Sequence, residues 1–309
     1  MAIERSLGSI MRTCYDLAVV NWNAKHNLGE LISVAEKIYH NQIKSIVGNV
    51  IAEGKQIILL AGPSSAGKTT SSKKLKEELE RHGITGQTIS LDDFFLERDR
   101  TPRLPNGNYD YENITALDLE HLARFVDDIT EKGKGSLPHY DFKTGTRDRV
   151  DDFIMGEGDV LVIEGNHALN PALQLGHADS MYKVYVTPNA NFELGRQVVL
   201  QARKLRLMRR IHRDMQTRGR SIHETIKGWD EVARGEDIYI CPYKSCADFL
   251  LDTAHMYEPL LWDSCLTKLL LPLKGIAYVD EMLDVFDKIG TVKKSAIPDE
   301  SLLWEFLVK

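Results

Sequence analysis

Short apolar runs alternate with segments of helical spacing along most of the chain. Runs of strand length lie at residues 56–61, 88–91, 160–163 and 182–187. Segments that read as helices lie at residues 68–81 and 118–132. Continuous apolar runs are typical of parallel strands that are buried on both faces. We therefore predict an α/β fold, a parallel sheet flanked by helices, with its ligand at the carboxyl ends of the strands.

The two ends of the chain extend this central pattern. Residues 28–53 carry apolar positions at helical spacing. We expect an N-terminal helical segment, residues 1–53, that packs on a core domain, residues 54–309. Beyond the fourth apolar run we expect helices at residues 198–217, 222–233, 281–289 and 301–307, and one additional strand at residues 247–252.

A phosphate-binding motif follows the first apolar run. It has the pattern G-x-x-x-x-G-K-[ST] and consists of Gly62, Pro63, Ser64, Ser65, Ala66, Gly67, Lys68, Thr69 and Thr70. Its glycines allow a tight turn whose N–H groups point at phosphate oxygens, and the following helix adds its positive end. Lys68 would reach the β- and γ-phosphates, and the Thr69 hydroxyl would ligate Mg²⁺. Because the motif lies between a predicted strand and a predicted helix, we favour a P-loop NTPase-type nucleotide site over a plain Gly/Ser-rich turn.

Acidic residues follow two further apolar runs. Asp92 and Asp93 come after the second run, and Glu164 comes after the third. An acid in such a place can hold Mg²⁺, directly or through water, or take a proton from an acceptor hydroxyl. Side chains alternate along a strand, so we expect only one of the two aspartates to face the site. Each acid alone could be a helix cap or turn residue. Together with the P-loop they predict a site for phosphoryl transfer.

A strongly basic segment lies in the second half of the chain. Residues 203–220 contain eight Lys and Arg. Three of them form one helical stripe with a fourth beside it, namely Arg206, Arg210 and Arg213 with Arg209. The segment could be a solvated helix face, a nucleic-acid patch or a lid. We favour a helical Arg-rich lid at about residues 200–236, because arginines that close over a P-loop stabilise the transferring charge and exclude water.

Composition narrows the class of protein. The chain has 309 residues and a net charge of −6, and its 43% hydrophobic residues are typical of an ordinary soluble globular protein. The negative charge disfavours a nucleic-acid partner, since such binding requires a basic surface. No apolar stretch approaches the ~20 residues of a membrane span, and the N-terminus lacks a signal-peptide core. The four cysteines do not have the spacing of a zinc site, and we expect reduced thiols and a cytoplasmic location.

Taken together, these motifs resemble the uridine kinase and phosphoribulokinase family. The matching pieces come in the family's order: GPSSAGKTT (62–70), SLDDFF (90–95), NYDYENITALD (108–118), LPHYDFKTGTR (137–147), VLVIEGNHALNP (160–171), RRIHRDMQTRGR (209–220) and GEDIYICPYKSCAD (235–248). The tail, with YEPLL (257–261) and IPDESLLWEFL (297–307), resembles the kinase portion of longer bacterial nucleoside kinases. Those carry an N-terminal TGS domain that we do not find in this sequence.

The resemblance implies an ATP- and Mg²⁺-dependent kinase and gives individual residues a role. Asp92 rather than Asp93 would be the base and a Mg²⁺ partner, and Glu164 would support Mg²⁺. The catalytic residues that the resemblance implies are Lys68, Asp92, Arg213 and Arg218. The acceptor-binding residues that it implies are Asp110, Tyr140, Arg210 and Arg220.

One position departs from the family pattern. Uridine-cytidine kinases place a pyrimidine-reading histidine after the Tyr-Asp-Phe stretch, and this sequence has Gly145 there. Glycine offers no side-chain hydrogen bond for discrimination. His139 and His167 lie in nearby motifs and are candidates to replace it, although structural roles are more common for such histidines. The acceptor is therefore predicted to be a nucleoside of the uridine or cytidine kind, with a sugar, a polyol or another hydroxyl metabolite as the alternative.

A further alternative is a nucleotide-binding regulatory protein that has no acceptor. GTP-dependent switches usually carry an Asn-Lys-x-Asp guanine reader, and the sequence has none. The pattern of residues leaves the oligomeric state open, including a homo-oligomer.

Overall fold

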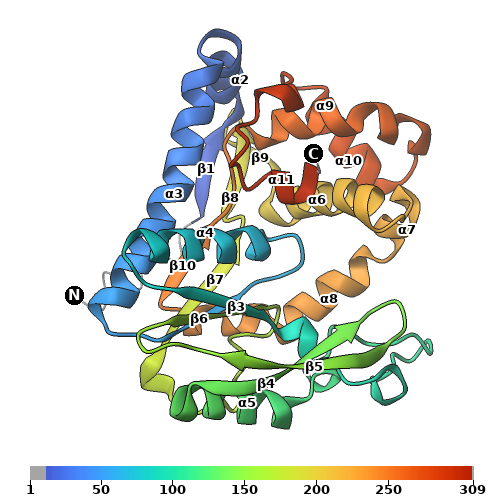
Figure 1. Cartoon of the computed structure of the whole chain (residues 1–309). Coiled ribbons are helices and arrows are strands. Elements are labelled where there is room, and N and C mark those ends of the chain that lie inside the picture. The colour runs from blue at the N-terminus through green and yellow to red at the C-terminus, as the bar shows by residue number, and fades with distance from the viewer. Residues whose placement is uncertain (1–11, 308–309) are drawn as a thin grey trace.

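A parallel sheet forms the centre of the molecule. The computed structural model describes residues 12–307. Its main sheet has five strands in the order β10-β7-β2-β6-β3, and each pairing is parallel (Figure 1). The strands are β2 Ile57–Ala61, β3 Gly86–Ser90, β6 Val160–Gly165, β7 Met181–Thr187 and β10 Phe249–Asp252. All five lie within two residues of the predicted runs, so the α/β fold of P-loop type is confirmed.

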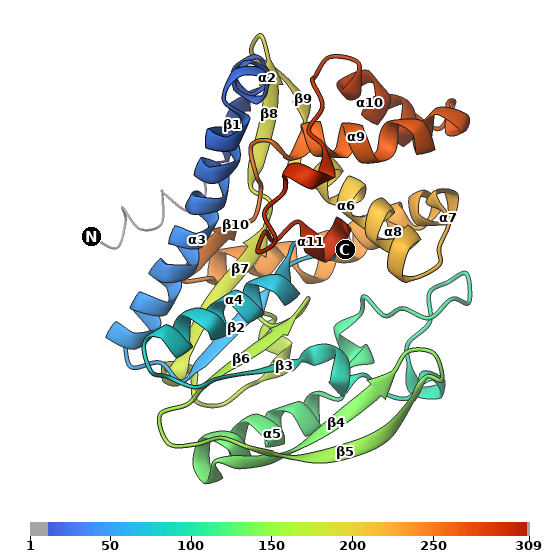
Figure 2. The same ribbon diagram turned by 45° about the horizontal axis from the view of Figure 1, so that its top comes forward.

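Alternate side chains of the strands enter two different cores. On β2, Ile58 and Leu60 belong to one core, whereas Ile57 and Leu59 belong to the other, as the two-residue period of a strand requires. The first core includes residues of α3 Leu28–Ala52, α4 Lys68–Arg81, α6 Ala202–Thr217 and α9 Glu258–Leu270. The second includes residues of α5 Leu119–Lys132 and of the β4–β5 hairpin, on the opposite side of the sheet (Figure 2).

The N-terminal part of the described chain is largely helical, as expected. A short helix, α2 Leu17–His26, is followed by α3, which contacts α4 and β10 and buries Ile46, Val47 and Val50 completely. A strand that was not predicted, β1 Thr13–Asp16, precedes them. Residues 1–11 of the predicted helical segment lie outside the described residues. The division into residues 1–53 and 54–309 stays a prediction.

The predicted helix at residues 198–217 is wrong at its start. Residues Gln197–Leu200 form strand β9, which pairs antiparallel with β8 Ala190–Leu194. Strand β8 also pairs in parallel with β1, so these strands make a second, three-stranded sheet. The β-branched pair Val198 and Val199 favours a strand there, and the basic helix α6 begins only after it.

The helices beyond α6 are also divided differently from the prediction. The helix expected at residues 222–233 is two helices, α7 Ile222–Lys227 and α8 Trp229–Tyr239, separated at Gly228. Helix α10 Ala277–Phe286 starts earlier than expected, and the last helix is short, α11 Trp304–Leu307. The large helix α9 was not predicted.

A long hairpin was also missed. Strands β4 Lys134–Asp141 and β5 Thr146–Ile154 pair antiparallel beside α5 (Figure 2). Most side chains of β5 are exposed, so the strand lacks the apolar pattern on which the prediction relied.

Two sequence-based expectations about environment can be compared with the described residues. Within residues 12–307, no helix is both long enough and apolar enough to cross a membrane. The thiols of Cys14, Cys241, Cys246 and Cys265 are free. The cytoplasmic location stays a prediction.

Candidate active site

The P-loop lies where the sequence places it, between β2 and α4. Helix α4 begins at Lys68, directly after Gly67. Gly67 has φ +97, and a Cβ atom there would lie 2.7 Å from Leu302, so only glycine suits this position. The Lys68 Nζ donates hydrogen bonds to the carbonyl of Gly62 at 2.9 Å and to Oδ1 of Asn166 at 2.8 Å. The ammonium group is thereby held over the loop.

Two arginines of α6 support the P-loop from behind. Arg206 donates to the carbonyl of Ser64 at 3.0 Å, and Arg209 donates to the carbonyl of Ser65 at 3.4 Å. Both side chains are buried, and each is neutralised by a buried acid: Arg206 by Glu236 and Arg209 by Glu258. These arginines therefore brace the loop and do not belong to a solvated face. The sequence indicated the stripe of arginines but not their acidic partners, Glu236 and Glu258, because these lie far away along the chain.

Carboxylates from two other strand ends lie beside Lys68. Asp92 lies in a 3-10 turn, Leu91–Phe94, that directly follows β3 and is capped by Ser90. Glu164 is the penultimate residue of β6, and its Oε1 accepts a hydrogen bond from Thr69 Oγ1 at 3.5 Å. The predicted strand ends thus bring Lys68, Thr69, Asp92 and Glu164 to one edge of the sheet.

The pKa values reflect this crowding of charges. Burial raises the pKa of Glu164 to about 7, although the positive charge of Lys68 opposes the shift. Surrounding protein atoms also raise the pKa of Asp92, while the charges of Lys68 and Arg218 lower it. The pKa of Lys68 is lowered by burial, and the charges of Glu164 and Asp92 oppose this. The three groups are therefore electrostatically coupled.

Asp214 organises the basic end of the site. It is completely buried, and its carboxylate lies within 3.5 Å of nitrogen atoms of Arg210, Arg213 and Arg218. Sequence reasoning missed this aspartate, although it lies inside the basic motif. Arg213 is mostly buried and Arg218 is about half exposed. Arg220 is exposed beyond the end of α6.

Arg210 lies between the P-loop and the Tyr-Asp-Tyr motif. Its Nη1 donates to Ser64 Oγ of the P-loop at 2.8 Å. Burial raises the pKa of Glu112, and the charge of Arg210 is the first to oppose that shift. Glu112 lies in the Tyr-Asp-Tyr motif two residues after Asp110, and Asp110 is itself buried. The motif supports the family resemblance, but the sequence alone did not indicate a role for Glu112.

A cluster of aromatic side chains surrounds Tyr140. Tyr140 of β4 is buried, and its ring centroid lies 5.7 Å from that of Phe95 and 4.9 Å from that of Phe142. Tyr111 lies 5.6 Å from Phe95. Burial raises the pKa of the Tyr140 hydroxyl to about 12, with Tyr111 as the next cause. The cluster joins the loop after β3, the Tyr-Asp-Tyr stretch and the β4–β5 hairpin.

The structure leaves no space for a side chain at Gly145. Its φ is +78, and a Cβ atom would lie 2.5 Å from the guanidinium carbon of Arg98. Arg98 donates to the carbonyl oxygens of Phe142 and Lys143, at 2.7 and 3.3 Å. An arginine from another loop therefore occupies the space that a side chain at residue 145 would need.

The two nearby histidines differ in their surroundings. His139 lies 3.6 Å from Asp93 and 3.1 Å from Asp151. Asp93 therefore pairs with a histidine, whereas the charge of Lys68 acts on Asp92. The choice of Asp92 as the residue that serves the site stays a prediction. His167 is buried, and burial lowers its pKa to about 4.

The family model settles what this arrangement is. Residues 57–257, more than half of the chain, match the model of the phosphoribulokinase/uridine kinase family. The chain belongs to this family. It is accordingly an ATP-dependent kinase that acts on a small molecule. The matched range begins with β2 and runs past β10, so it contains all five strands of the main sheet.

Curated relatives of this kinase are uridine kinases. The chain is 28% identical over 196 residues to the uridine kinase of Bacillus subtilis, which covers 63% of this chain and 84% of that protein. It is 28% identical over 197 residues to the uridine kinase of Staphylococcus aureus strain JH9, which covers 63% of this chain and 86% of that one.

Solved structures with a similar course of the chain include two further kinases. A possible uridine kinase from Bacillus stearothermophilus matches with a TM-score of 0.42 at 19% identity, over 69% of this chain and 98% of that one. The D-glycerate 3-kinase from Cryptococcus neoformans matches with a TM-score of 0.40 at 17% identity, over 66% and 87%.

Proposed function

We propose that this kinase transfers the γ-phosphoryl group of ATP to a hydroxyl of a nucleoside of the uridine or cytidine kind. One observation carries the proposal: the P-loop with Lys68 lies beside acids at two neighbouring strand ends, Asp92 in the turn after β3 and Glu164 on β6, whose Oε1 lies 3.5 Å from Thr69 Oγ1. This is the set of groups that phosphoryl transfer requires, a cation for the phosphates and an acid beside the acceptor. The uridine kinase relatives favour a nucleoside.

Each residue has a role in the proposed mechanism. Lys68 neutralises charge on the β- and γ-phosphates, and Asp92 accepts the proton of the attacking hydroxyl. Arg213 and Arg218, oriented by Asp214, stabilise the charge that develops on the transferring group and exclude water. Positioning by the braced loop supplies much of the remaining rate enhancement.

The acceptor would lie against the aromatic cluster. Asp110, buried beside Glu112, is proposed to hold the acceptor's vicinal hydroxyls, and Tyr140 to line its ring. Arg210 lies between the P-loop and Glu112, where it can orient the acceptor toward the phosphates. For Arg220 the proposal rests on the motif alone.

The residues also fit Mg²⁺. Thr69, Asp92 and Glu164 offer the oxygen atoms that this ion prefers. Among residues 12–307, no group of three or more His, Cys, Asp or Glu side chains is arranged to hold a metal. Mg²⁺ is usually bound by one or two carboxylates together with substrate phosphates. The ion would neutralise phosphate charge.

A sugar or polyol acceptor is the second candidate, and one observation favours it. Arg98 fills the space at Gly145, so the pocket has no imidazole at the place from which the family resemblance expects a pyrimidine to be read. An acceptor without a base would not need that group.

The test is a panel of hydroxyl compounds with ATP and Mg²⁺, scored by ADP release, with the Lys68→Ala variant as the blank. We expect uridine or cytidine to stimulate release far above the rate without acceptor. Stimulation by sugars or polyols alone would transfer the assignment to the second candidate. Tight ATP binding without stimulation by any compound would contradict a nucleoside, sugar or polyol acceptor.

A further inference from the structure

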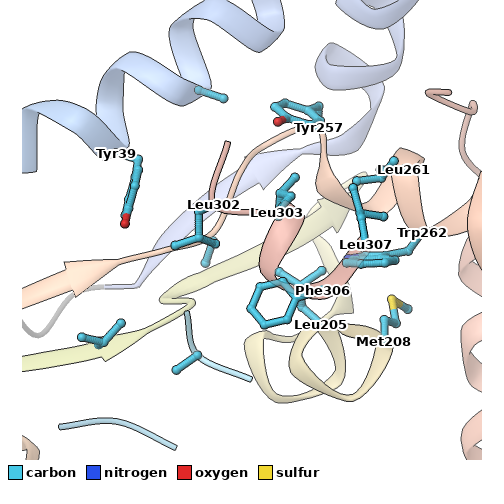
Figure 3. Packing of buried hydrophobic residues seen from close by; sticks show 14 of the residues in the cluster. Tyr39, Leu205, Met208, Tyr257, Leu261, Trp262, Leu302, Leu303, Phe306 and Leu307 are labelled. Atoms are coloured by element: carbon cyan, nitrogen blue, oxygen red, sulfur yellow. The ribbon is translucent and has the colours of Figure 1, made fainter. Parts of the chain in front are cut away.

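The last turn of the chain packs directly on the P-loop. We call residues 301–307 the C-terminal strap. Leu302, Leu303 and Phe306 of the strap are completely buried, among Leu205 of α6 and Trp262 of α9 (Figure 3). Leu302 occupies the space that a side chain at Gly67 would need. The strap therefore forms one wall of the phosphate cradle.

The backbone of the strap is fixed from several sides. The carbonyl of Phe306 lies 2.9 Å from Nδ1 of His212, and the guanidinium of Arg209 lies 4.8 Å from the Phe306 ring centroid. Arg209 is the same residue that donates to the P-loop carbonyl of Ser65. The strap and the loop are thus held by one buried arginine, and a displacement of the strap as a whole would expose several large apolar side chains.

The strap brings a carboxylate to the start of α4. Glu305 Oε2 accepts a hydrogen bond from the backbone N–H of Thr70 at 2.8 Å. Thr70 is the last residue of the P-loop motif and lies in the first turn of α4. N–H groups at this place are among those that cradle nucleotide phosphates. Burial lowers the pKa of Lys68, and Glu305 is one of the nearby acids that oppose this shift, so its charge reaches the cradle.

We propose that Glu305 competes with the nucleotide phosphates for the Thr70 amide and thereby weakens nucleotide binding. The amide has one proton, so a phosphate oxygen can accept it only after the carboxylate has rotated away. Two anions beside one helix terminus also repel each other. Because the strap backbone is fixed, the exchange takes place at the Glu305 side chain. The kinase would hold ATP and ADP less tightly than the bare cradle and release its product sooner.

The proposal depends on the placement of the ATP phosphates in the P-loop. It is tested by measuring the dissociation constants of ATP and of tripolyphosphate, with Mg²⁺, by calorimetry. Glu305→Ala should bind both ligands about ten- to a hundredfold more tightly than the wild-type protein, the ratio expected from one charge-assisted hydrogen bond. Glu305→Gln removes the charge but keeps an oxygen that can accept the Thr70 proton, so it should show a smaller gain. The KM for ATP should fall with the dissociation constant.

The matched control is Glu300→Gln. It removes the same charge from an exposed position one residue before the strap, and it should leave both dissociation constants unchanged. Thermal unfolding of each variant without nucleotide confirms that it folds.

Four outcomes separate the possibilities. Tighter binding of both ligands by the Glu305 variants alone supports the proposal. Unchanged or weaker binding overturns it, since a side chain that merely stabilises the loop would give that result. A gain for ATP without a gain for tripolyphosphate also overturns it, because Glu305 would then face the base. If no protein, including the wild type, binds ATP, the proposed P-loop site fails together with this inference.

Discussion

The two halves of the active site are built by different means. In the nucleotide half, the P-loop is held by hydrogen bonds from buried side chains to its backbone, among them those of Arg206 and Arg209. In the other half, where we propose that the acceptor binds, aromatic side chains from three separate segments pack around Tyr140; we call it the acceptor half. A backbone cradle accepts few alternative sequences, whereas a cluster of side chains can change its contents at little cost. This difference explains why the chemistry can be read from the motif while the acceptor cannot.

The largest expected effect lies in the nucleotide half. Lys68→Ala should lower turnover about a thousandfold, because a fixed cation at the transferring charge is lost. Acceptor-dependent ADP release measures the change. Lys73→Ala on the exposed face of the same helix is the matched control and should retain full activity. Similar rates in the two variants would show that the P-loop lysine does not act on the phosphates.

The next largest effect concerns the proposed general base, Asp92, between the two halves. Asp92→Asn should lower kcat about a hundredfold or more, as loss of a general base predicts. Asp93→Asn, which removes the partner of His139, should have a much smaller effect. A larger loss of kcat in Asp93→Asn than in Asp92→Asn would assign the role of base to Asp93.

The nucleotide half could be predicted from the sequence, because each element is specified by adjacent residues. Residues 68–81 form α4 as predicted, Asp92 follows β3, and Glu164 lies at the end of β6. What could not be predicted depends on partners remote in the chain. The buried pair of Arg209 and Glu258 is separated by 49 positions, and no local pattern reveals it.

The acceptor half was predicted less well for a related reason. Strand β5 is mostly exposed, so it lacks the alternation by which strands are recognised. The sequence could not predict that Arg98 fills the space at Gly145, because the missed β4–β5 hairpin brings the two residues together.

The acceptor half gives a smaller effect that is specific to Gly145. Gly145→His should lower the free energy of unfolding by about 2–5 kcal/mol, from backbone strain at positive φ and overlap with Arg98. Chemical denaturation measures it. Gly107→His is the control, because Gly107 also has positive φ but has open space where its Cβ would lie. Equal losses in both variants would mean that Arg98 yields freely and does not define the pocket.

The smallest expected effect concerns a buried acid of α3. Glu36 of α3 is buried, accepts a hydrogen bond from Tyr257 at 2.7 Å and lies 3.4 Å from His255. Glu36→Gln should lower the free energy of unfolding by about 1–3 kcal/mol at pH 7, as for other buried hydrogen-bond partners. The exposed Glu53→Gln at the end of α3 should leave it nearly unchanged.

We also expect Glu36 to make the free energy of unfolding depend on pH in a defined direction. Burial alone would raise the pKa of Glu36, but the His255 ring and neighbouring hydroxyl groups lower it to about 2. A depressed pKa contributes stability above the unfolded value near 4.5, and this contribution is lost as the pH falls from there toward about 2. Denaturation at several pH values should show a shallower acid decline for Glu36→Gln. Parallel declines in the two proteins would contradict the assignment.

The central claim is that the two halves cooperate in moving one phosphoryl group to a hydroxyl. Phosphorus NMR of the wild-type protein with ATP, Mg²⁺ and uridine follows this transfer directly. The account predicts a new phosphomonoester resonance that grows in step with ADP. Formation of ADP with inorganic phosphate only, at the same rate with and without acceptor compounds, would contradict it.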